Sequence, residues 1–155
     1  FGATANHGDG TVSIINTQTL AVEKTIRTGE GAHGVVFDPA GEFLFVANSS
    51  EDTLSVIETA SFSKQGKIPI GEFPEYVGVT RDGSKIFTTN LEGEGSVTVL
   101  EHNGFASRVI KTLDLGIDPH GWAVSPDGRA VVITNLENNI AHLLDADTFE
   151  PIQKD

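Results

Sequence analysis

Cysteine is absent from this chain of 155 residues, and its absence narrows the chemistry before any motif is considered. Without thiols the chain cannot form disulfides, thiolate metal sites, c-type haem attachments or a cysteine nucleophile. Because cysteine usage is what would indicate an oxidising or a reducing compartment, the redox compartment is left open.

Basic residues are scarce: ten Lys and Arg stand against 22 Asp and Glu, which gives a formal net charge of −12 at pH 7. Nucleic-acid binding requires clustered Lys and Arg to neutralise phosphates, so the composition excludes it. An anionic membrane surface is an unfavourable partner for the same reason. The acid excess is also compatible with a plain contribution to solubility.

The chain also lacks a hydrophobic run long enough for a membrane span or a signal peptide, so we expect no membrane insertion. It opens at Phe1 rather than Met, from which we expect a processed or excised piece of a longer protein. No Gly-x-Ser-x-Gly elbow, P-loop, dinucleotide fingerprint or His-Glu-x-x-His pattern occurs. We therefore favour a non-catalytic role over an enzymatic one.

A repeated phrase dominates what is present. Short strand-like segments end in Asn6, Asn48, Asn90 and Asn135, at spacings of 42, 42 and 45 residues. A turn precedes the last three of these asparagines, at 38–41, 80–83 and 125–128. A fixed period in this range indicates stacked supersecondary units, because each unit buries its apolar face only against a neighbour.

Each complete unit contains four short segments with strand patterning and none with helical periodicity, which we call a to d from the inside outward. The expected ranges are 34–38, 76–80 and 121–125 for a; 1–6, 43–48, 85–90 and 130–135 for b; 11–16, 53–58, 96–101 and 140–145 for c; 21–27, 64–70, 107–113 and 151–154 for d. Four antiparallel strands per repeat of this length predict an all-β fold, a β-propeller built of four-stranded antiparallel blades.

The predicted propeller is incomplete. The whole chain, 1–155, is expected to form one partial domain of about 3.5 blades: a blade part at 1–29, blades at 30–71 and 72–116, and a blade part at 117–155. Propellers close with typically four to eight blades, so the ring needs further blades from a longer chain or from a second copy. We favour the longer chain, because the breaks fall inside blades.

With the units aligned, the consensus Gly-x-x-Pro/Ala-x-Gly-Val-x-Val-x-Pro-Asp-Gly is followed by a strand ending x-Thr/Ala-Asn and by Thr-Val-Ser-Val-Ile-Asp/Glu-Thr. This resembles the YVTN-type β-propeller repeat, whose members are often seven-bladed. Similar repeats occur in exported surface-layer-like proteins, which implies a periplasmic or extracellular location. Related propellers hold haem d1 or copper clusters, so the resemblance covers enzymes and non-enzymes alike.

The loops joining b to c and d to a are expected on one face of the propeller, the top. This face receives no Lys or Arg; it receives Asp9, Glu30, Glu51, Asp52, Glu72, Glu75, Glu92, Glu94, Asp118 and Glu137. Tyr76 and Trp122 fall near the central channel, where we expect them either to contact a ligand or to pack between blades. Such a face predicts attraction to a cationic ligand or a basic protein partner.

Three histidines map to the same face. His33 and His120 occupy one repeat position at the entrance to strand a, Glu75 takes that position in the intervening blade, and His7 lies in the first b–c loop. Imidazoles and carboxylates at a channel mouth could bind a transition metal or a haem-type cofactor. We expect His33 and His120 about 10 Å apart by ring geometry, which suits bracketing a cofactor better than chelating one ion.

Two functional hypotheses follow. The first is a non-catalytic scaffold whose acidic top face binds a cationic ligand or a protein. The alternative is a segment of a periplasmic redox protein that holds a metal or haem-type cofactor through the top-face histidines.

Overall fold

The computed structural model describes residues 1–152, and within them it has fourteen strands and no α-helix, which confirms the all-β propeller prediction. The strands are β1 (Gly2–Asn6), β2 (Thr11–Asn16), β3 (Ala21–Arg27), β4 (Ala32–Phe37), β5 (Phe43–Asn48), β6 (Thr53–Glu58), β7 (Ser63–Pro69), β8 (Pro74–Val79), β9 (Lys85–Asn90), β10 (Ser96–Glu101), β11 (Arg108–Asp114), β12 (Pro119–Val124), β13 (Ala130–Asn135) and β14 (Ile140–Asp145). A 3-10 turn, η1 (His7–Asp9), lies between β1 and β2.

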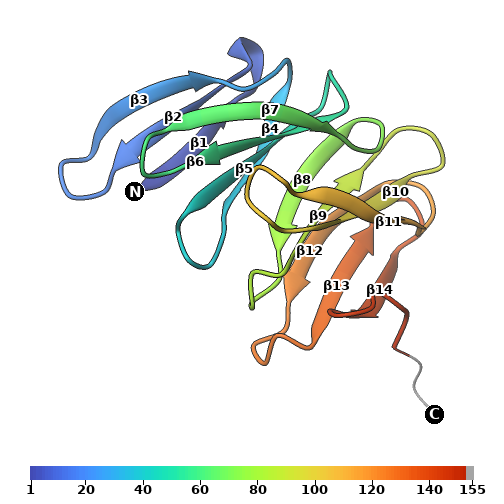
Figure 1. Cartoon of the computed structure of the whole chain (residues 1–155). Helices are drawn as coiled ribbons and strands as arrows, with labels where there is room; N and C mark the ends of the chain where they lie inside the picture. The colour runs from blue at the N-terminus through green and yellow to red at the C-terminus, as the bar shows by residue number, and fades with distance from the viewer. Residues whose placement is uncertain (153–155) are drawn as a thin grey trace.

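The strands form four antiparallel sheets whose strands follow one another in sequence order. β4–β7 and β8–β11 make four-stranded sheets, while β1–β3 and β12–β14 make three-stranded ones. Figure 1 shows the sheets side by side from the blue N-terminal one to the orange C-terminal one, in an arc that does not close. Each sheet falls within one unit of the sequence repeat, so the four sheets are the blades.

The hydrophobic core is divided among the junctions between neighbouring sheets. One cluster joins Val12 and Ile14 of β2 to Leu44 and Val46 of β5. Equivalent clusters join the second sheet to the third, around Phe45, and the third to the fourth, around Phe87. Because each sheet buries apolar side chains against the next, stability comes from nearest-neighbour contacts along the array.

The repeated asparagine links strand b to strand c through its side chain. Asn48 Nδ2 donates to Thr53 Oγ1 at 3.0 Å and to Ser55 Oγ at 3.0 Å. Asn6 and Asn90 make the same pair of bonds to hydroxyl groups of β2 and β10. Asn135 instead donates to carbonyl oxygens of the loop at 115–118, because Ile140 and His142 replace the two hydroxyl residues in its blade.

The fourth strand expected at 151–154 lies partly outside the described residues. Within them, Pro151 forms an isolated bridge to Leu144, and the Ile152 N–H donates to the Leu143 carbonyl. A separate finding concerns membranes: the described residues contain no helix of the length and apolar character that a membrane crossing requires.

Candidate functional site

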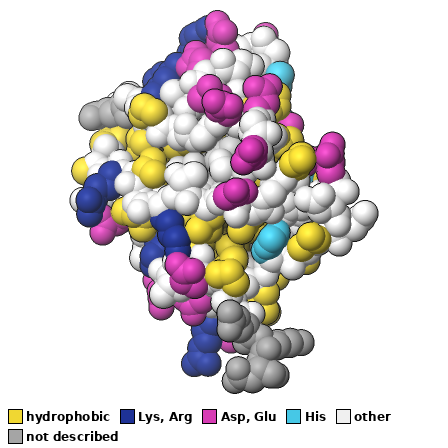
Figure 2. All heavy atoms as spheres, turned by 90° about the vertical axis from the view of Figure 1, so that its right-hand side faces the viewer, with side chains coloured by type: hydrophobic (Ala, Val, Ile, Leu, Met, Phe, Trp, Pro, Cys, Tyr) yellow, Lys and Arg dark blue, Asp and Glu magenta, His cyan; other side chains and the backbone are white. Residues whose placement is uncertain are grey.

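Seven loops lie at one end of the sheets, because alternate turns of an antiparallel sheet fall on the same side. They span 7–10, 28–31, 49–52, 70–73, 91–95, 115–118 and 136–139, and we call this end the top face. These loops contain no Lys or Arg and carry Asp9, Glu30, Glu51, Asp52, Glu72, Glu92, Glu94, Asp118 and Glu137. Figure 2 shows acidic side chains over the upper and middle part of one side, with Lys and Arg mainly along its left-hand edge.

Basic side chains from the outermost strands nevertheless reach three of these loops. Lys67 of β7 pairs with Glu51, and this hydrogen bond lowers the pKa of the Glu51 carboxyl. Arg27 of β3 donates to the backbone carbonyl of Asp9. Lys64 of β7 donates to the Thr28 carbonyl in the 28–31 loop at 3.0 Å. Assigning charge by loop alone therefore overstates the acidity at these three places.

Two of the predicted binding-face aspartates have backbone roles as well. Asp52 has a φ of 55°, and its Oδ1 accepts a hydrogen bond of 2.8 Å from the Phe73 N–H. Asp118 has a φ of 59°, and its carbonyl accepts from the Leu136 N–H. Aspartate tolerates this left-handed conformation better than most residues, so both positions also hold the loops in place.

The innermost strand of each of the last three sheets is interrupted by a bulge at one repeat position. The pairing register shifts between Ala32 and Val35, between Pro74 and Tyr76, and between Pro119 and Trp122. His33, Glu75 and His120 lie within these three bulges. A bulge re-aims side chains that regular pairing would direct to opposite faces.

The bulges bring side chains of three sheets into one row. The ring of Tyr76 lies between those of His33 and His120, at centroid distances of 5.5 and 4.7 Å. His33 Nδ1 lies 3.0 Å from the Glu75 carbonyl oxygen, and since that oxygen can only accept, Nδ1 carries the proton. His7 extends the row, with its ring 5.8 Å from that of His33.

The four predicted metal ligands are not gathered around one point. Among residues 1–152, no three side chains of His, Cys, Asp or Glu are placed to share a metal ion. Of the predicted set, Glu75 and His120 do meet, with His120 Nε2 3.6 Å from Glu75 Oε2. Trp122 packs edge-on against Phe87 at 5.2 Å, within the cluster that joins the third and fourth sheets.

Tyr76 lies at the centre of this row, whereas the sequence predicts only that it falls near the channel. The other two sheets have glycine at its repeat position, Gly34 and Gly121, after a histidine. A Cβ atom at Gly34 would lie 2.5 Å from the Glu75 carbonyl oxygen, so the innermost strands approach closely there. The departure from glycine was the signal that could have identified Tyr76 as the centre of the row.

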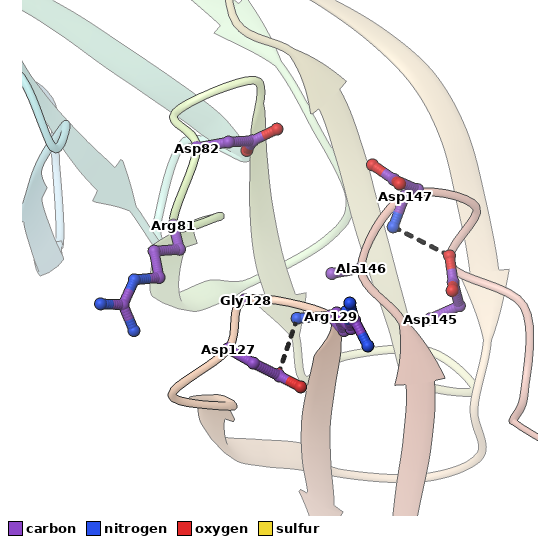
Figure 3. Close-up of a pocket in the computed structure, with 8 residues that line it drawn as sticks. All are labelled: Arg81, Asp82, Asp127, Gly128, Arg129, Asp145, Ala146 and Asp147. Atoms are coloured by element: carbon purple, nitrogen blue, oxygen red, sulfur yellow. Dashed lines mark hydrogen bonds between the residues drawn. The ribbon is translucent and has the colours of Figure 1, made fainter.

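A second feature lies at the opposite end of the sheets. Turns of the third and fourth sheets enclose a hollow of about 540 Å³ lined by Arg81, Asp82, Asp127, Gly128, Arg129, Asp145, Ala146 and Asp147. Figure 3 shows the Arg129 N–H donating to Asp127 and the Asp147 N–H donating to Asp145.

Three carboxylates of this hollow accept hydrogen bonds from groups in their own turns. Asp82 Oδ1 accepts from the Ser84 N–H and the Thr80 hydroxyl, which lowers the pKa of Asp82 to about 2. The pKa values of Asp127 and Asp145 are lowered by hydrogen bonds of the same kind, chiefly from the Ser125 hydroxyl and the Thr148 N–H. We therefore assign these residues to turn structure and take the top face as the candidate site.

Comparison with known proteins supports the fold and no closer relationship. No protein-family model matches the chain, and no curated protein matches it. Among solved structures, hydrazine synthase of Kuenenia stuttgartiensis is 17% identical, with a TM-score of 0.85 over 96% of this chain and 43% of that one. A chain of a mitotic checkpoint complex is 12% identical, with a TM-score of 0.82 over 92% of this chain and 46% of that one.

A third similar structure, a protein of unknown function from Desulfotomaculum acetoxidans, is 18% identical, with a TM-score of 0.78 over 95% of this chain and 51% of that one. At these identities the likeness establishes the β-propeller fold alone. The chain spans about half the length of the solved chains that it matches.

Proposed function

We propose that this chain is a non-catalytic part of a β-propeller scaffold whose top face binds a basic protein segment or another cationic ligand. The observation that carries the proposal is the set of loops at that end, which bear carboxylates and no lysine or arginine. A field of one sign attracts oppositely charged partners and raises their rate of association.

The third sheet offers the most available carboxylates. Glu72, Glu92, Glu94 and Asp114 line a hollow of about 340 Å³ between the 70–73 and 91–95 loops. None of the four pairs with a Lys or Arg side chain in the part of the chain that the structure describes. Carboxylates without internal partners remain free to interact with the cation of a ligand.

The test is the binding of a fluorescently labelled octalysine peptide to the full chain, followed by anisotropy at several salt concentrations. We expect affinity to fall as salt rises, because exposed charges are screened beyond about 10 Å at 0.1 M ionic strength. The double variant Glu92→Gln with Glu94→Gln should weaken binding about fivefold or more, which corresponds to about 1 kcal/mol.

A control with the same change in net charge separates the top face from general electrostatics. Glu23 lies on the outermost strand β3, and Glu42 lies in the turn between β4 and β5. The double variant Glu23→Gln with Glu42→Gln should leave the affinity nearly unchanged. Equal weakening by both double variants, or binding that does not respond to salt, would contradict the proposal.

We also propose that the chain belongs to a longer YVTN-type propeller that is exported from the cell. The repeat consensus supports the family. This chain covers only about half of each solved chain that it matches, which supports the presence of further blades. Those blades come from the same polypeptide or from a second copy. The native mass of the isolated chain distinguishes the two: a stable dimer supports the second copy, and a monomer supports the longer chain.

A further inference from the structure

Two oxygen atoms converge on one nitrogen of His120. Tyr76 Oη lies 3.4 Å from His120 Nε2, and Glu75 Oε2 lies 3.6 Å from the same nitrogen. Both oxygens come from β8 of the third sheet, whereas His120 belongs to β12 of the fourth. The three atoms therefore meet across a junction between blades.

Hydrogen bonding satisfies this arrangement only weakly, because both oxygens lie farther from Nε2 than the about 2.7–3.2 Å that is usual for an N–H···O hydrogen bond. An imidazole nitrogen either carries a proton and donates, or lacks one and accepts. Without a proton, Nε2 accepts from the Tyr76 hydroxyl and has nothing to offer the Glu75 carboxylate. With a proton, it can donate to either oxygen or be shared between them, but both oxygens lie at long hydrogen-bond distances. A proton relay would place the two oxygens at opposite nitrogens of the ring, and here both approach Nε2.

The local backbone accounts for the convergence. Residues 75 and 76 are neighbours, which regular strand geometry would direct to opposite faces. The bulge between Pro74 and Tyr76 changes that geometry, and both side chains reach His120. The side chains of Glu75 and His120 are 18% and 31% exposed, so their polar atoms are partly shielded from water but remain accessible.

We propose that His120 Nε2, Glu75 Oε2 and Tyr76 Oη bind one divalent transition metal ion, zinc or copper. Ligand atoms about 2.0–2.1 Å from a tetrahedral ion lie about 3.3–3.4 Å apart, close to the observed 3.4 and 3.6 Å. Imidazole, carboxylate and phenolate offer nitrogen and oxygen donors that suit these ions. On binding, the phenol loses its proton to water, and the fourth position of the ion stays open to solvent at the top face.

This assignment revises the predicted ligand set. His120 and Glu75 remain, Tyr76 enters, and His33 and His7 leave it. The Nδ1 of His33 is committed to the Glu75 carbonyl, and His7 lies beyond His33 in the row. The ion site is separate from the proposed peptide-binding carboxylates, so either proposal can fail without the other.

Tyr76 is the only tyrosine of the chain, which gives the experiment a site-specific probe. The full chain is labelled with ring-¹³C tyrosine and titrated with zinc sulfate in a non-chelating buffer, with NMR detection. We expect the Tyr76 ring signals to shift and to saturate at one equivalent of zinc. Calorimetry in parallel should give one site, and copper(II) should bind more tightly than zinc, in line with the Irving–Williams order.

Variants then identify the ligands. His120→Gln should weaken zinc binding at least about tenfold, the scale seen when even an outer-shell partner of a metal ligand is removed. Tyr76→Phe retains the ring, removes the oxygen and should also weaken binding. The controls are His7→Gln and the Glu92→Gln, Glu94→Gln double variant, which should bind zinc as the unaltered chain does.

Several results would overturn the assignment. Tyr76 signals that stay unchanged up to several equivalents of zinc would exclude this site without any variant. Equal weakening by His7→Gln and His120→Gln would indicate diffuse binding to the acidic face. Circular dichroism of each variant keeps loss of folding distinct from loss of a ligand.

Discussion

A methyl group at Gly34 should disrupt the contact between the second and third sheets. The Cβ of an alanine there would lie 2.5 Å from the Glu75 carbonyl oxygen, 2.8 Å from Tyr76 Cα and 2.9 Å from Val77 N. All three atoms belong to the backbone of β8, so no side-chain rotation can relieve the overlap. Gly34→Ala therefore requires β4 and β8 to move apart.

The magnitude follows from two opposing effects. Overpacking of a tight contact costs typically about 1–3 kcal/mol. Replacing glycine restricts the unfolded chain and returns about 0.4–1 kcal/mol. We expect Gly34→Ala to lower the free energy of unfolding by about 1–2 kcal/mol and to shift the Tyr76 ring signals, because the added methyl presses on its backbone.

Gly121 occupies the same repeat position and serves as the matched control. A Cβ atom there would meet Thr134 Oγ1 at 3.0 Å, which is a side-chain atom that can rotate away. Gly121→Ala should change the free energy of unfolding by no more than about 0.5 kcal/mol. Urea denaturation of the two variants and the unaltered chain measures the difference. A Gly34→Ala chain as stable as Gly121→Ala would show that the close approach of β4 and β8 is not required.

Three further predictions concern the bonds and contacts that hold the blades. Asn48→Ala should lower the free energy of unfolding by about 2 kcal/mol and Asn6→Ala by about 1 kcal/mol, as measured by urea denaturation. Each variant loses two side-chain hydrogen bonds, but Asn48 is fully buried and Asn6 is not. Equal losses of stability would contradict the role of burial. Asp82 has its pKa lowered to about 2 in the folded chain, so its stabilisation is present above the unfolded pKa near 4 and is lost as pH falls towards 2. Asp82→Asn should therefore lower the free energy of unfolding at pH 7 by up to about 1 kcal/mol, a figure reduced to allow for screening by solvent. This loss of stability should vanish near pH 2. A loss that does not change with pH would show that the negative charge of Asp82 is not its source. Phe87→Ala should cost about 3 kcal/mol or more, because the ring is fully buried between the third and fourth sheets. The fluorescence of Trp122, the only tryptophan, should shift to the red at the same time, and an unchanged spectrum would mean that the junction repacks.

Strands b and c could be predicted closely because their pattern is local. The segments expected at 43–48, 53–58, 85–90, 96–101, 130–135 and 140–145 match the structure residue for residue. Alternation of apolar and polar residues and the terminal asparagine define these strands without reference to other blades.

Strand a was predicted less well. Each one begins two residues earlier than expected, at Ala32, Pro74 and Pro119, and then passes through a bulge. A bulge breaks the period-two pattern, so sequence alternation alone starts the strand after it. The omitted residues include His33, Glu75 and His120 of the candidate site.

The row around Tyr76 also depended on contacts that no local pattern encodes. The sequence placed His33, Glu75 and His120 at equivalent positions, but which side chains meet depends on the spacing of neighbouring sheets. Tyr76 contacts both histidines with its ring, and its backbone lies close to Gly34 of the neighbouring sheet. Repeat alignment therefore located the site and could not supply its geometry.

The repeated bulge has a consequence for how such a protein can diversify. The pairs that flank it are equivalent in neighbouring sheets: Ala32 with Asn48 and Val35 with Val46 correspond to Pro74 with Asn90 and Val77 with Thr88. The two residues between these pairs can therefore change from His-Gly to Glu-Tyr while the flanking register stays the same. Each blade thus contributes an exchangeable pair of side chains to a common inner wall. Substitution blade by blade could produce many different linings of one channel without redesign of the frame that supports them.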